Sequence, residues 1–272
     1  DCIREIPASR WDLHRLDPLR SSSGKPMSRW GGFVRDAECF DPRFFRITPR
    51  EAEIIDPQER LFLETCWTAM EDAGYTPESL APPRGPRRKR DVGVFVGVMH
   101  KDYSLVGAEA VADGVTFPLS LSYAQIANRV SYVCDFHGPS IALDTVCSSS
   151  LTALHLAAES LRRGECVAAL AGGVNLSLHP YKYMSYGVAD MHSSDGRCRA
   201  FGDGGGIRHR QRFGAPIGEG AGPGSRSFGL HHHGETSIVG RQLHRQQEDP
   251  GLCAQQSQGL EVGAVGVDAL LT

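Results

Sequence analysis

The stretch that decides the fold runs from Ser140 to Leu151 and reads Ser-Ile-Ala-Leu-Asp-Thr-Val-Cys-Ser-Ser-Ser-Leu. A short apolar run ends at Cys147, three serines follow, and a helical pattern continues to Gly164. A thiol between a strand and a helix N-terminus meets backbone N–H groups and the positive end of the helix dipole, which favour the thiolate. The same N–H groups can hold an oxyanion during acyl transfer. The pattern therefore indicates a nucleophile at Cys147, with a buried structural cysteine as the alternative.

The composition of the 272-residue chain argues against several classes of protein. Its net charge of −3 gives no global signature for binding nucleic acid or a membrane surface. Eight cysteines are too few for a disulfide scaffold, and no CxxC pair indicates a structural zinc site. No apolar run reaches the roughly 20 residues of a membrane span, and the start lacks the shape of a signal peptide. We expect a cytoplasmic protein with no metal, no nucleic-acid partner and no membrane contact.

Hydrophobic patterning predicts helices alternating with strands. The expected helices are 51–74, 122–133 and 148–163, and the strands expected to be buried on both faces are 92–98, 141–146 and 167–174. The apolar stripes are placed at Leu61, Leu63, Trp67, Met70 and Ala73 in the first helix, and at Leu151, Leu154, Ala158 and Leu161 in the last. The basic, proline-rich run 79–91 predicts an exposed loop rather than a nucleic-acid contact. The alternation predicts an α/β fold with a covered sheet.

Short motifs in a fixed order extend through residues 7–206. They include Arg29-Trp30-Gly31-Gly32-Phe33, Asp56-Pro57-Gln58-Glu59-Arg60-Leu61, Val92-Gly93-Val94-Phe95-Val96-Gly97, Ile126-Ala127-Asn128-Arg129-Val130-Ser131-Tyr132, Ala171-Gly172-Gly173-Val174-Asn175 and Ser194-Asp195-Gly196-Arg197-Cys198-Arg199-Ala200-Phe201. Together with the Cys147 segment they resemble the ketosynthase domain of modular polyketide synthases, a β-ketoacyl synthase with the thiolase-like α/β condensing-enzyme fold. One departure is Val146, where the family usually has alanine. The run 175–183 resembles the variant in synthases whose acyltransferase is a separate protein.

The resemblance implies a specific chemistry at Cys147. This residue would accept an acyl chain from the phosphopantetheine arm of an acyl carrier protein, with its own backbone N–H in the oxyanion hole. A malonyl thioester on a second carrier would then lose carbon dioxide, and its carbanion would attack the acyl thioester to give a β-ketoacyl chain. The resemblance implies no directly bound cofactor. It also implies a homodimer in the intact parent, paired through segments 122–146.

Two histidines that the family uses to stabilise the developing enolate are missing from the chain. The family carries them in a His-Gly-Thr-Gly-Thr and an Asn-Ile-Gly-His segment, and neither occurs here. We expect structural roles for His137 and His155, and we assign none to His179 and His192. The chain alone is therefore expected to be incompetent for condensation. Because it opens with Asp1 and lacks the first strand of the fold, it is expected to be a piece of a longer protein.

The sequence changes character after Gly206, which suggests a boundary between residues 1–206, the synthase N-terminal region, and residues 207–272. Seven of nine glutamines lie beyond it, whereas no lysine, tyrosine or tryptophan does. Residues 246–259 can be back-translated into a DNA sequence that, when its reading frame is shifted by one base, encodes a different peptide. That peptide, Asn-Arg-Lys-Thr-Pro-Gly-Tyr-Ala-Pro-Asn-Ser-Pro-Lys, resembles the family at this place. Because 218–220 and 234–240 look family-like unshifted, we predict a degenerate, frame-shifted continuation with more than one insertion or deletion. We therefore expect no metal at His231-His232-His233 and no phosphate loop at the glycines within 202–206.

Two other functions remain open. A non-elongating relative would only load and pass acyl chains through Cys147, and would not need both histidines. An inactive pseudogene product or interaction fragment would do neither. The DNA on either side of this segment discriminates among the three readings.

Overall fold

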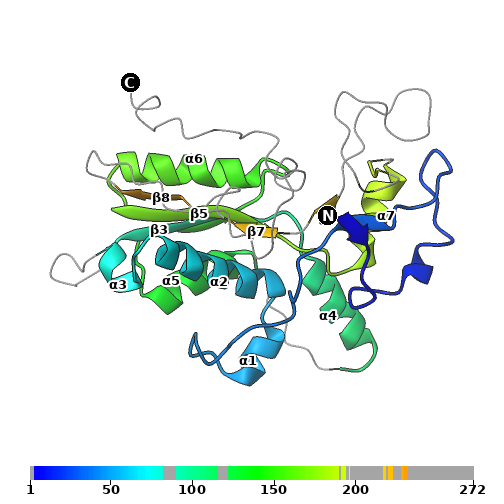
Figure 1. Ribbon diagram of the computed structural model, residues 1–272, viewed down its shortest axis with the longest axis horizontal. Helices are drawn as coiled ribbons and strands as arrows, with labels where there is room; N and C mark the ends of the chain where they lie inside the picture. The colour runs from blue at the N-terminus through cyan, green and yellow to red at the C-terminus, as the bar shows by residue number, and fades with distance from the viewer. Residues whose placement is uncertain are drawn as a thin grey trace.

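A parallel sheet between two helical layers forms the centre of the computed structural model (Figure 1). The structure describes residues 3–81, 90–115, 122–189, 191–193 and 196, together with the backbone of 217–218, 220–222 and 228–231. Strands β4 (Ser140–Leu143), β3 (Val92–Gly97) and β5 (Ala168–Asn175) are parallel and adjacent in that order. Antiparallel strands β7 (Gly220–Gly222) and β8 (Phe228–His231) both pair with β5.

The central strand β3 is buried along its whole length, as the continuous apolar run 92–98 predicts. Strand β5 is buried over most of its length and confirms the strand expected at 167–174. The strand expected at 141–146 is only partly right, because β4 ends at Leu143 and none of its residues is fully buried. Among the described strands β4 pairs only with β3, so it forms an edge of this sheet. Residues 144–146 instead form the turn that leads to Cys147.

Helices α2 (Pro57–Asp72), α3 (Pro77–Leu80) and α5 (Ala124–Cys134) cover one face of the sheet, and α6 (Ser149–Arg162) covers the other (Figure 1). The expected helices 122–133 and 148–163 are confirmed as α5 and α6. The single helix expected at 51–74 is wrong, because α1 (Pro49–Ile54) ends before α2 begins. Pro57 disfavours helical geometry at the preceding residue, and Asp56 caps α2 by accepting the Gln58 N–H at 2.8 Å.

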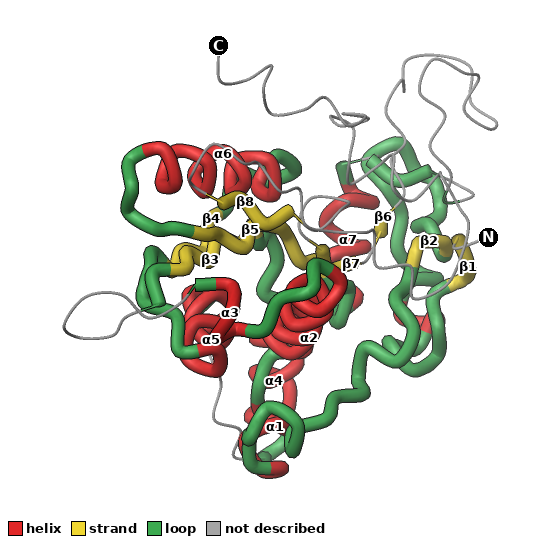
Figure 2. Tube along the Cα trace, turned by 60° about the vertical axis from the view of Figure 1, so that its left-hand side comes forward, coloured by secondary structure: helices red, strands yellow, loops and turns green. Residues whose placement is uncertain are grey.

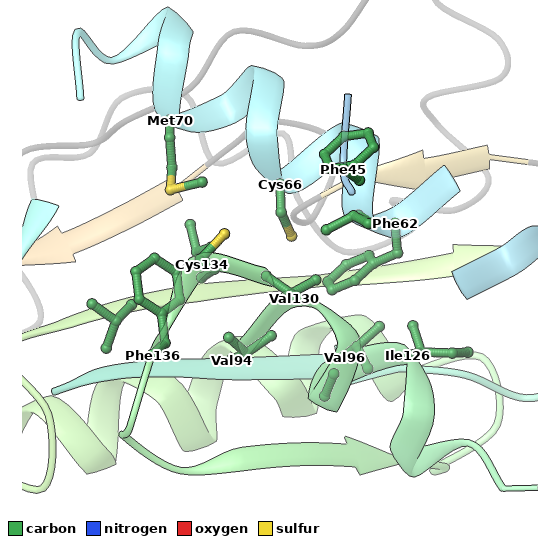
Figure 3. Close-up of a cluster of buried hydrophobic side chains, with 14 of the residues drawn as sticks. Phe45, Phe62, Cys66, Met70, Val94, Val96, Ile126, Val130, Cys134 and Phe136 are labelled. Carbon is green, nitrogen blue, oxygen red and sulfur yellow. The ribbon is translucent and has the colours of Figure 1, made fainter. Parts of the chain in front are cut away.

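The faces that the helices bury match the expected stripes only in part. In α6, Leu161 of the expected stripe is buried and Leu154 packs against the same cluster, whereas Leu151 is 38% exposed. The small side chains of Ala153 and Ala157 are the ones fully buried there. In α2 the fully buried apolar residues are Phe62, Leu63, Cys66, Ala69 and Met70, while Leu61 and Trp67 are only partly buried. Figure 3 shows side chains of α2, α5 and β3 meeting in this core. Leu151 differs from the expectation because the sequence does not reveal how closely a helix approaches its sheet.

The N-terminal segment packs at the far end of the molecule from α6 (Figure 2). Strand β1 (Ile3–Glu5) pairs with β2 (Trp30–Gly32), and β2 pairs in parallel with β6 (Ile217–Gly218). A 3-10 turn, η1 (Leu13–Arg15), follows β1. Trp11, Leu16 and Phe33 join Tyr183 of helix α7 (Pro180–Val188) in a second hydrophobic cluster. Helix α4 (Asp102–Ala112) completes the fold, and no described helix has the length and apolar composition to cross a membrane.

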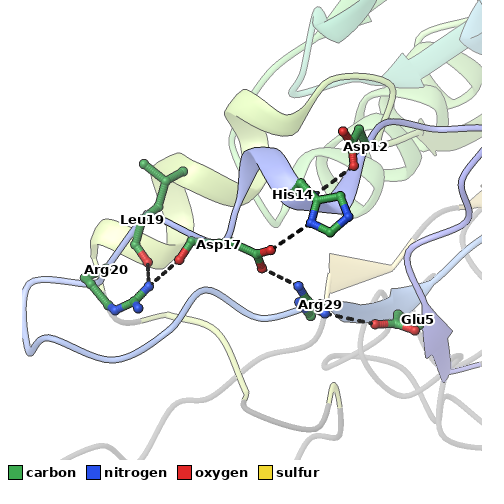
Figure 4. A network of polar contacts seen from close by, with 7 residues as sticks. All are labelled: Glu5, Asp12, His14, Asp17, Leu19, Arg20 and Arg29. Carbon is green, nitrogen blue, oxygen red and sulfur yellow. Dashed lines mark hydrogen bonds and ion pairs between the residues drawn. The ribbon is translucent and has the colours of Figure 1, made fainter.

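An exposed polar network ties the N-terminal segment together (Figure 4). The Arg29 guanidinium forms an ion pair with Asp17 and a longer one, at 3.7 Å, with Glu5. The bond from Arg29 is the largest cause that lowers the pKa of the Asp17 carboxyl, and the bond from His14 adds to it. Because both partners are exposed, we expect this network to orient the segment more than to stabilise it.

Candidate active site

Three strands end at one edge of the sheet, and the segments that follow them build the candidate site. Gly97 of β3 is opposite Leu143 of β4 and Gly173 of β5, so β3 and β4 end level and β5 continues two residues further on the same side. Cys147 lies four residues beyond β4, and His100 lies three residues beyond β3. In open α/β sheets this carboxyl edge is where ligands bind.

Hydrogen bonds fix the turn that presents Cys147. The Asp144 carboxylate accepts the Val146 N–H at 2.8 Å, which holds Val146 in the left-handed region at a φ of 61°. The Ser149 hydroxyl accepts the Thr145 N–H at 2.9 Å and donates to the Val146 carbonyl at 2.6 Å. A positive φ is an outlier for a β-branched residue, so the turn holds Val146 in a strained conformation. The valine in place of the family's alanine therefore bears on backbone conformation as well as packing.

Cys147 is exposed and directly precedes Ser148, the N-cap residue of α6. The Ser148 hydroxyl does not cap the helix but donates to the Thr145 carbonyl at 2.8 Å. The thiol therefore lies at the positive end of a 14-residue helix, where a thiolate or an oxyanion is electrostatically favoured. Strand, turn, cysteine and helix occur in the order that the sequence predicts.

Two glycines allow the first turn of α6 to approach the sheet closely. A Cβ atom on Gly97 would lie 2.5 Å from the carbonyl carbon of Ser149 and 2.6 Å from the amide nitrogen of Ser150. On the neighbouring strand, a Cβ on Gly173 would lie 2.9 Å from Cβ of Ser150. The absence of side chains at these paired positions sets the height of the Cys147 turn above the sheet.

The other described cysteines have different environments. Cys66, Cys134 and Cys166 are buried, and burial is the largest cause that raises the pKa of each thiol, to about 12 for Cys134. Cys39 is exposed but lies outside the helices and strands. Cys2, Cys198 and Cys253 lie outside the described residues. Among the described cysteines, only Cys147 combines exposure with a position immediately before the N-cap of a helix.

His100, to which no motif in the sequence assigns a role, lies at the same end of the sheet as Cys147. Its Nε2 atom lies 2.8 Å from the Tyr186 hydroxyl of α7. Burial is the main cause that lowers the pKa of His100 to about 4, and the positive charge of Lys182 lowers it further. His100 lies two residues past the strand expected at 92–98, so inspecting the residues just beyond each expected buried strand would have found it from the sequence.

Buried polar groups hold the segments around this edge in place. Gln58 of α2 donates from Nε2 to the His100 carbonyl at 2.9 Å, and its Oε1 accepts the Leu176 N–H at 3.1 Å. One buried amide thus joins the segment after β3 to the segment after β5. Lys182 donates to the Asn175 side chain at 2.6 Å and to the Leu176 carbonyl at 3.2 Å, which fixes α7 to the same segment.

The histidines that were candidates from the sequence do not form a cluster with one another. His137 contacts Asp135 at 3.7 Å ahead of β4, and His155 is exposed on α6. His179 caps α7 by accepting the Tyr181 N–H at 3.1 Å and contacts Glu109. No group of three potential metal-ligating side chains occurs within the described part of the chain. The side chains of His231-His232-His233 and the glycines within 202–206 lie outside it.

Comparison with known proteins identifies the class to which this fold and site belong. Residues 1–223 match the family described as beta-ketoacyl synthase, N-terminal domain, and the chain belongs to that family. The match continues past residue 206. The expected thiolase-like α/β condensing-enzyme fold is confirmed by the solved ketosynthases described below.

The relatives are polyketide synthases. Over 205 residues the chain is 71% identical to polyketide synthase PksM of Bacillus subtilis, a match that covers 75% of this chain and 5% of the relative. It is 67% identical over 218 residues to PksL of the same organism, covering 80% of this chain and 5% of PksL. The chain therefore spans about one twentieth of these curated relatives.

Solved ketosynthase domains share the fold. The oxazolomycin ketosynthase domain OzmH KS7 of Streptomyces albus JA3453 is 52% identical, with a TM-score of 0.67 over 75% of this chain and 34% of that one. The ketosynthase from module 6 of the bacillaene synthase of Bacillus subtilis 168 is 38% identical, with a TM-score of 0.65 over 80% of this chain and 34% of that one. The chain therefore spans about a third of each solved ketosynthase.

Proposed function

We propose that this chain is the acyl-accepting part of a polyketide ketosynthase, with Cys147 as the nucleophile. The Cys147 thiolate attacks the thioester carbonyl of an acyl chain on the phosphopantetheine arm of an acyl carrier protein. A new C–S bond forms, and the pantetheine thiolate leaves and takes up a proton. The observation that carries this proposal is the exposed thiol between a parallel strand and the N-terminus of α6. Backbone N–H groups of the turn, including that of Cys147, would hold the oxyanion.

In the intact parent the acylated cysteine would serve carbon–carbon bond formation. A malonyl-carrier thioester loses carbon dioxide, and the resulting carbanion attacks the acyl carbonyl, so that Cys147 leaves as the thiolate and a β-ketoacyl chain remains on the carrier. This step requires imidazoles to stabilise the enolate, and the chain lacks both family segments that supply them. Loss of such preorganised donors costs about 10²–10³-fold each in rate. The chain alone is therefore proposed to accept acyl groups without condensing them.

The test combines acylation and condensation in one incubation. The purified chain is mixed with an acyl thioester and malonyl-carrier, and the masses of the protein and the products are measured. We expect an acyl adduct that maps to Cys147 and disappears in Cys147→Ala, and no β-ketoacyl product. Cys39→Ala is the matched control because it removes another exposed thiol. A β-ketoacyl product that depends on Cys147 would contradict the proposed incompetence, and the absence of an adduct on Cys147 would contradict the acyl-accepting role.

The high similarity to PksM and PksL, together with the run 175–183, supports a parent whose acyltransferase is a separate protein. Two alternative functions would give different experimental results. A non-elongating synthase would be acylated and would carry an intact downstream frame without one of the histidine segments. An inactive fragment would not be acylated, and early stop codons would follow its sequence.

Residues 207–272 are proposed to be a frame-shifted continuation of the same domain. The family match to residue 223 and the pairing of β6 and β7 support a family-like stretch there, as expected for a frame that is lost and regained. Resequencing the encoding DNA tests this proposal. Insertions or deletions that restore the family sequence, with both histidine segments, are expected. Confirmation of the present reading frame would overturn the proposal.

A homodimer of the intact parent is proposed to form across the edge strand β4. Side chains exposed around this edge include Tyr132 (82% exposed) on α5, Ile141 on β4, and Leu151 on α6. An uncovered strand edge flanked by apolar side chains is a surface that a second copy can pair with. Sedimentation of the ketosynthase should show a dimer that Ile141→Lys weakens. Val111→Lys is the matched control, because Val111 is exposed on α4, and equal dimerisation in both variants would contradict the proposed surface.

A further inference from the structure

Tyr186 of α7 lies between two histidines, and the chemistry proposed for Cys147 uses none of the three residues. The Tyr186 hydroxyl lies 2.8 Å from Nε2 of His100, and its ring centroid lies 6.3 Å from that of His192. We refer to His100, Tyr186 and His192 as the His–Tyr–His cluster. His100 comes from the segment after β3, Tyr186 from α7 and His192 from the segment after α7. Tertiary packing therefore brings His100 to the other two residues.

The cluster lies beside the Cys147 turn. Strand register places His100 and Cys147 just beyond the paired ends of β3 and β4. The segment that carries His100 is held in place, because Gln58 binds the His100 carbonyl and the Tyr123 hydroxyl donates to the Met99 carbonyl at 2.8 Å. Burial is the largest cause that raises the pKa of Tyr186, and the negative charge of the Cys147 thiolate adds to it.

The members of the cluster are uncharged at neutral pH. Burial is the largest cause that raises the pKa of Tyr186 to about 12 and lowers those of His100 and His192 to about 4. Both ring nitrogens of His192 are shielded from solvent and have no hydrogen-bond partner among the described residues. Burial that keeps the three groups uncharged also disfavours a charged ligand group, and the charges that act on the cluster have both signs, Lys182 against Asp102 and Asp144.

We infer that the His–Tyr–His cluster recognises a neutral hydrogen-bonding substituent, such as a hydroxyl, on the acyl chain that Cys147 accepts. This inference rests on the proposed function, because it names the substrate class of the same site. A hydroxylated chain would form a hydrogen bond with Tyr186 or His100. A saturated hydrocarbon chain would cover these polar groups without bonding them, and that desolvation has a free-energy cost.

The first experiment compares two acyl chains of the same length on the full chain. Acylation of Cys147 by the N-acetylcysteamine thioesters of 3-hydroxybutyrate and butyrate is followed by intact-protein mass. We expect the hydroxylated chain to react about three- to tenfold faster, the range of one net hydrogen bond. Tyr186→Phe should remove this preference, so that the two thioesters acylate Cys147 at the same rate. Tyr183→Phe is the matched control, because its hydroxyl, on the same helix, donates to the Trp30 carbonyl instead.

The second experiment separates the inference from the proposed nucleophile. Non-reacting amide analogues of the same two chains are titrated into the chain, into Tyr186→Phe and into His100→Gln, and their dissociation constants are measured. Tighter binding of the hydroxylated analogue, lost in both variants, would support the cluster even if Cys147 proved unreactive. Equal binding of the two analogues, or a preference that survives both substitutions, would overturn the inference while leaving the proposed function intact.

Discussion

Replacing Gly97 with alanine should displace the Cys147 turn. The added methyl carbon would lie 2.5 Å from the carbonyl carbon of Ser149, whereas ordinary contact begins at 3.4 Å, so backbone must move by about 0.9 Å. The two nearest obstructing atoms belong to the main chain of the first turn of α6 and cannot rotate away. Overpacking of this kind costs about 1–3 kcal/mol of stability. A misplacement of about 1 Å near a reacting group can lower a rate about 10²-fold.

The assay uses Gly93→Ala as the matched control. Gly93 lies in the same strand, but its added methyl would meet the ring of Phe95 at 2.7 Å, and the nearest atoms are side-chain atoms that can shift. Urea unfolding should show both variants to be destabilised. Thioester acylation of Cys147 should fall about 10²-fold only in Gly97→Ala, with alkylation of the distant Cys39 as an internal reference. If Gly97→Ala acylates as fast as Gly93→Ala, the close approach of α6 does not position the thiol, and the reasoning is refuted.

Three further substitutions test other features. Val146→Gly should stabilise the fold by about 1 kcal/mol in urea unfolding, because Val146 is strained at a positive φ and 54% exposed; a loss of stability would contradict that strain. Burial raises the pKa of Asp56 to about 6, so this carboxyl binds a proton more tightly in the folded protein than in the unfolded one. The free energy of unfolding should therefore fall by up to about 3 kcal/mol as pH rises from 4 to 6, and Asp56→Asn should remove this pH dependence. Parallel curves of stability against pH for the two proteins would disprove it. Arg129→Gln should lower the free energy of unfolding by about 3–5 kcal/mol, because it leaves the buried Glu59 carboxylate without its partner at 2.7 Å. Arg162→Gln, which breaks an exposed ion pair, should lower it by under about 1 kcal/mol. Equal losses would mean that burial of the pair is unimportant.

Local patterns in the sequence account for the elements that are long and strongly apolar. The run 92–98 could be read as a buried strand because it needs only continuous hydrophobicity, and β3 is that strand. The strand–cysteine–helix order around Cys147 was also readable, because the serines and the following periodicity mark a helix start. The same reasoning missed the break before Pro57, where a local steric effect outweighs a continuous apolar stripe.

What the sequence did not reveal depends on distances between elements. Nothing in residues 140–143 distinguishes an edge strand from a central one, because that depends on which strands pair. The expected apolar face of α6 is right at Leu161 but wrong at Leu151 for a related reason, since Gly97 and Gly173 decide how close the first turn of the helix lies. Tyr186 could not be associated with His100 because the two are 86 positions apart, and only the packing of α7 brings them together.

The Gln58 amide has a consequence for how such a domain can diversify. Its two bonds reach the His100 carbonyl and the Leu176 N–H, which are main-chain groups that almost every amino acid provides. The side chains that follow β3 and β5 can therefore be exchanged without loosening the anchor that holds their backbone. A chimaera that keeps α2 and imports these segments from another ketosynthase should retain their placement while changing the groups that face the acyl chain. Substrate preference can in this way change by single substitutions on a backbone that stays where it is.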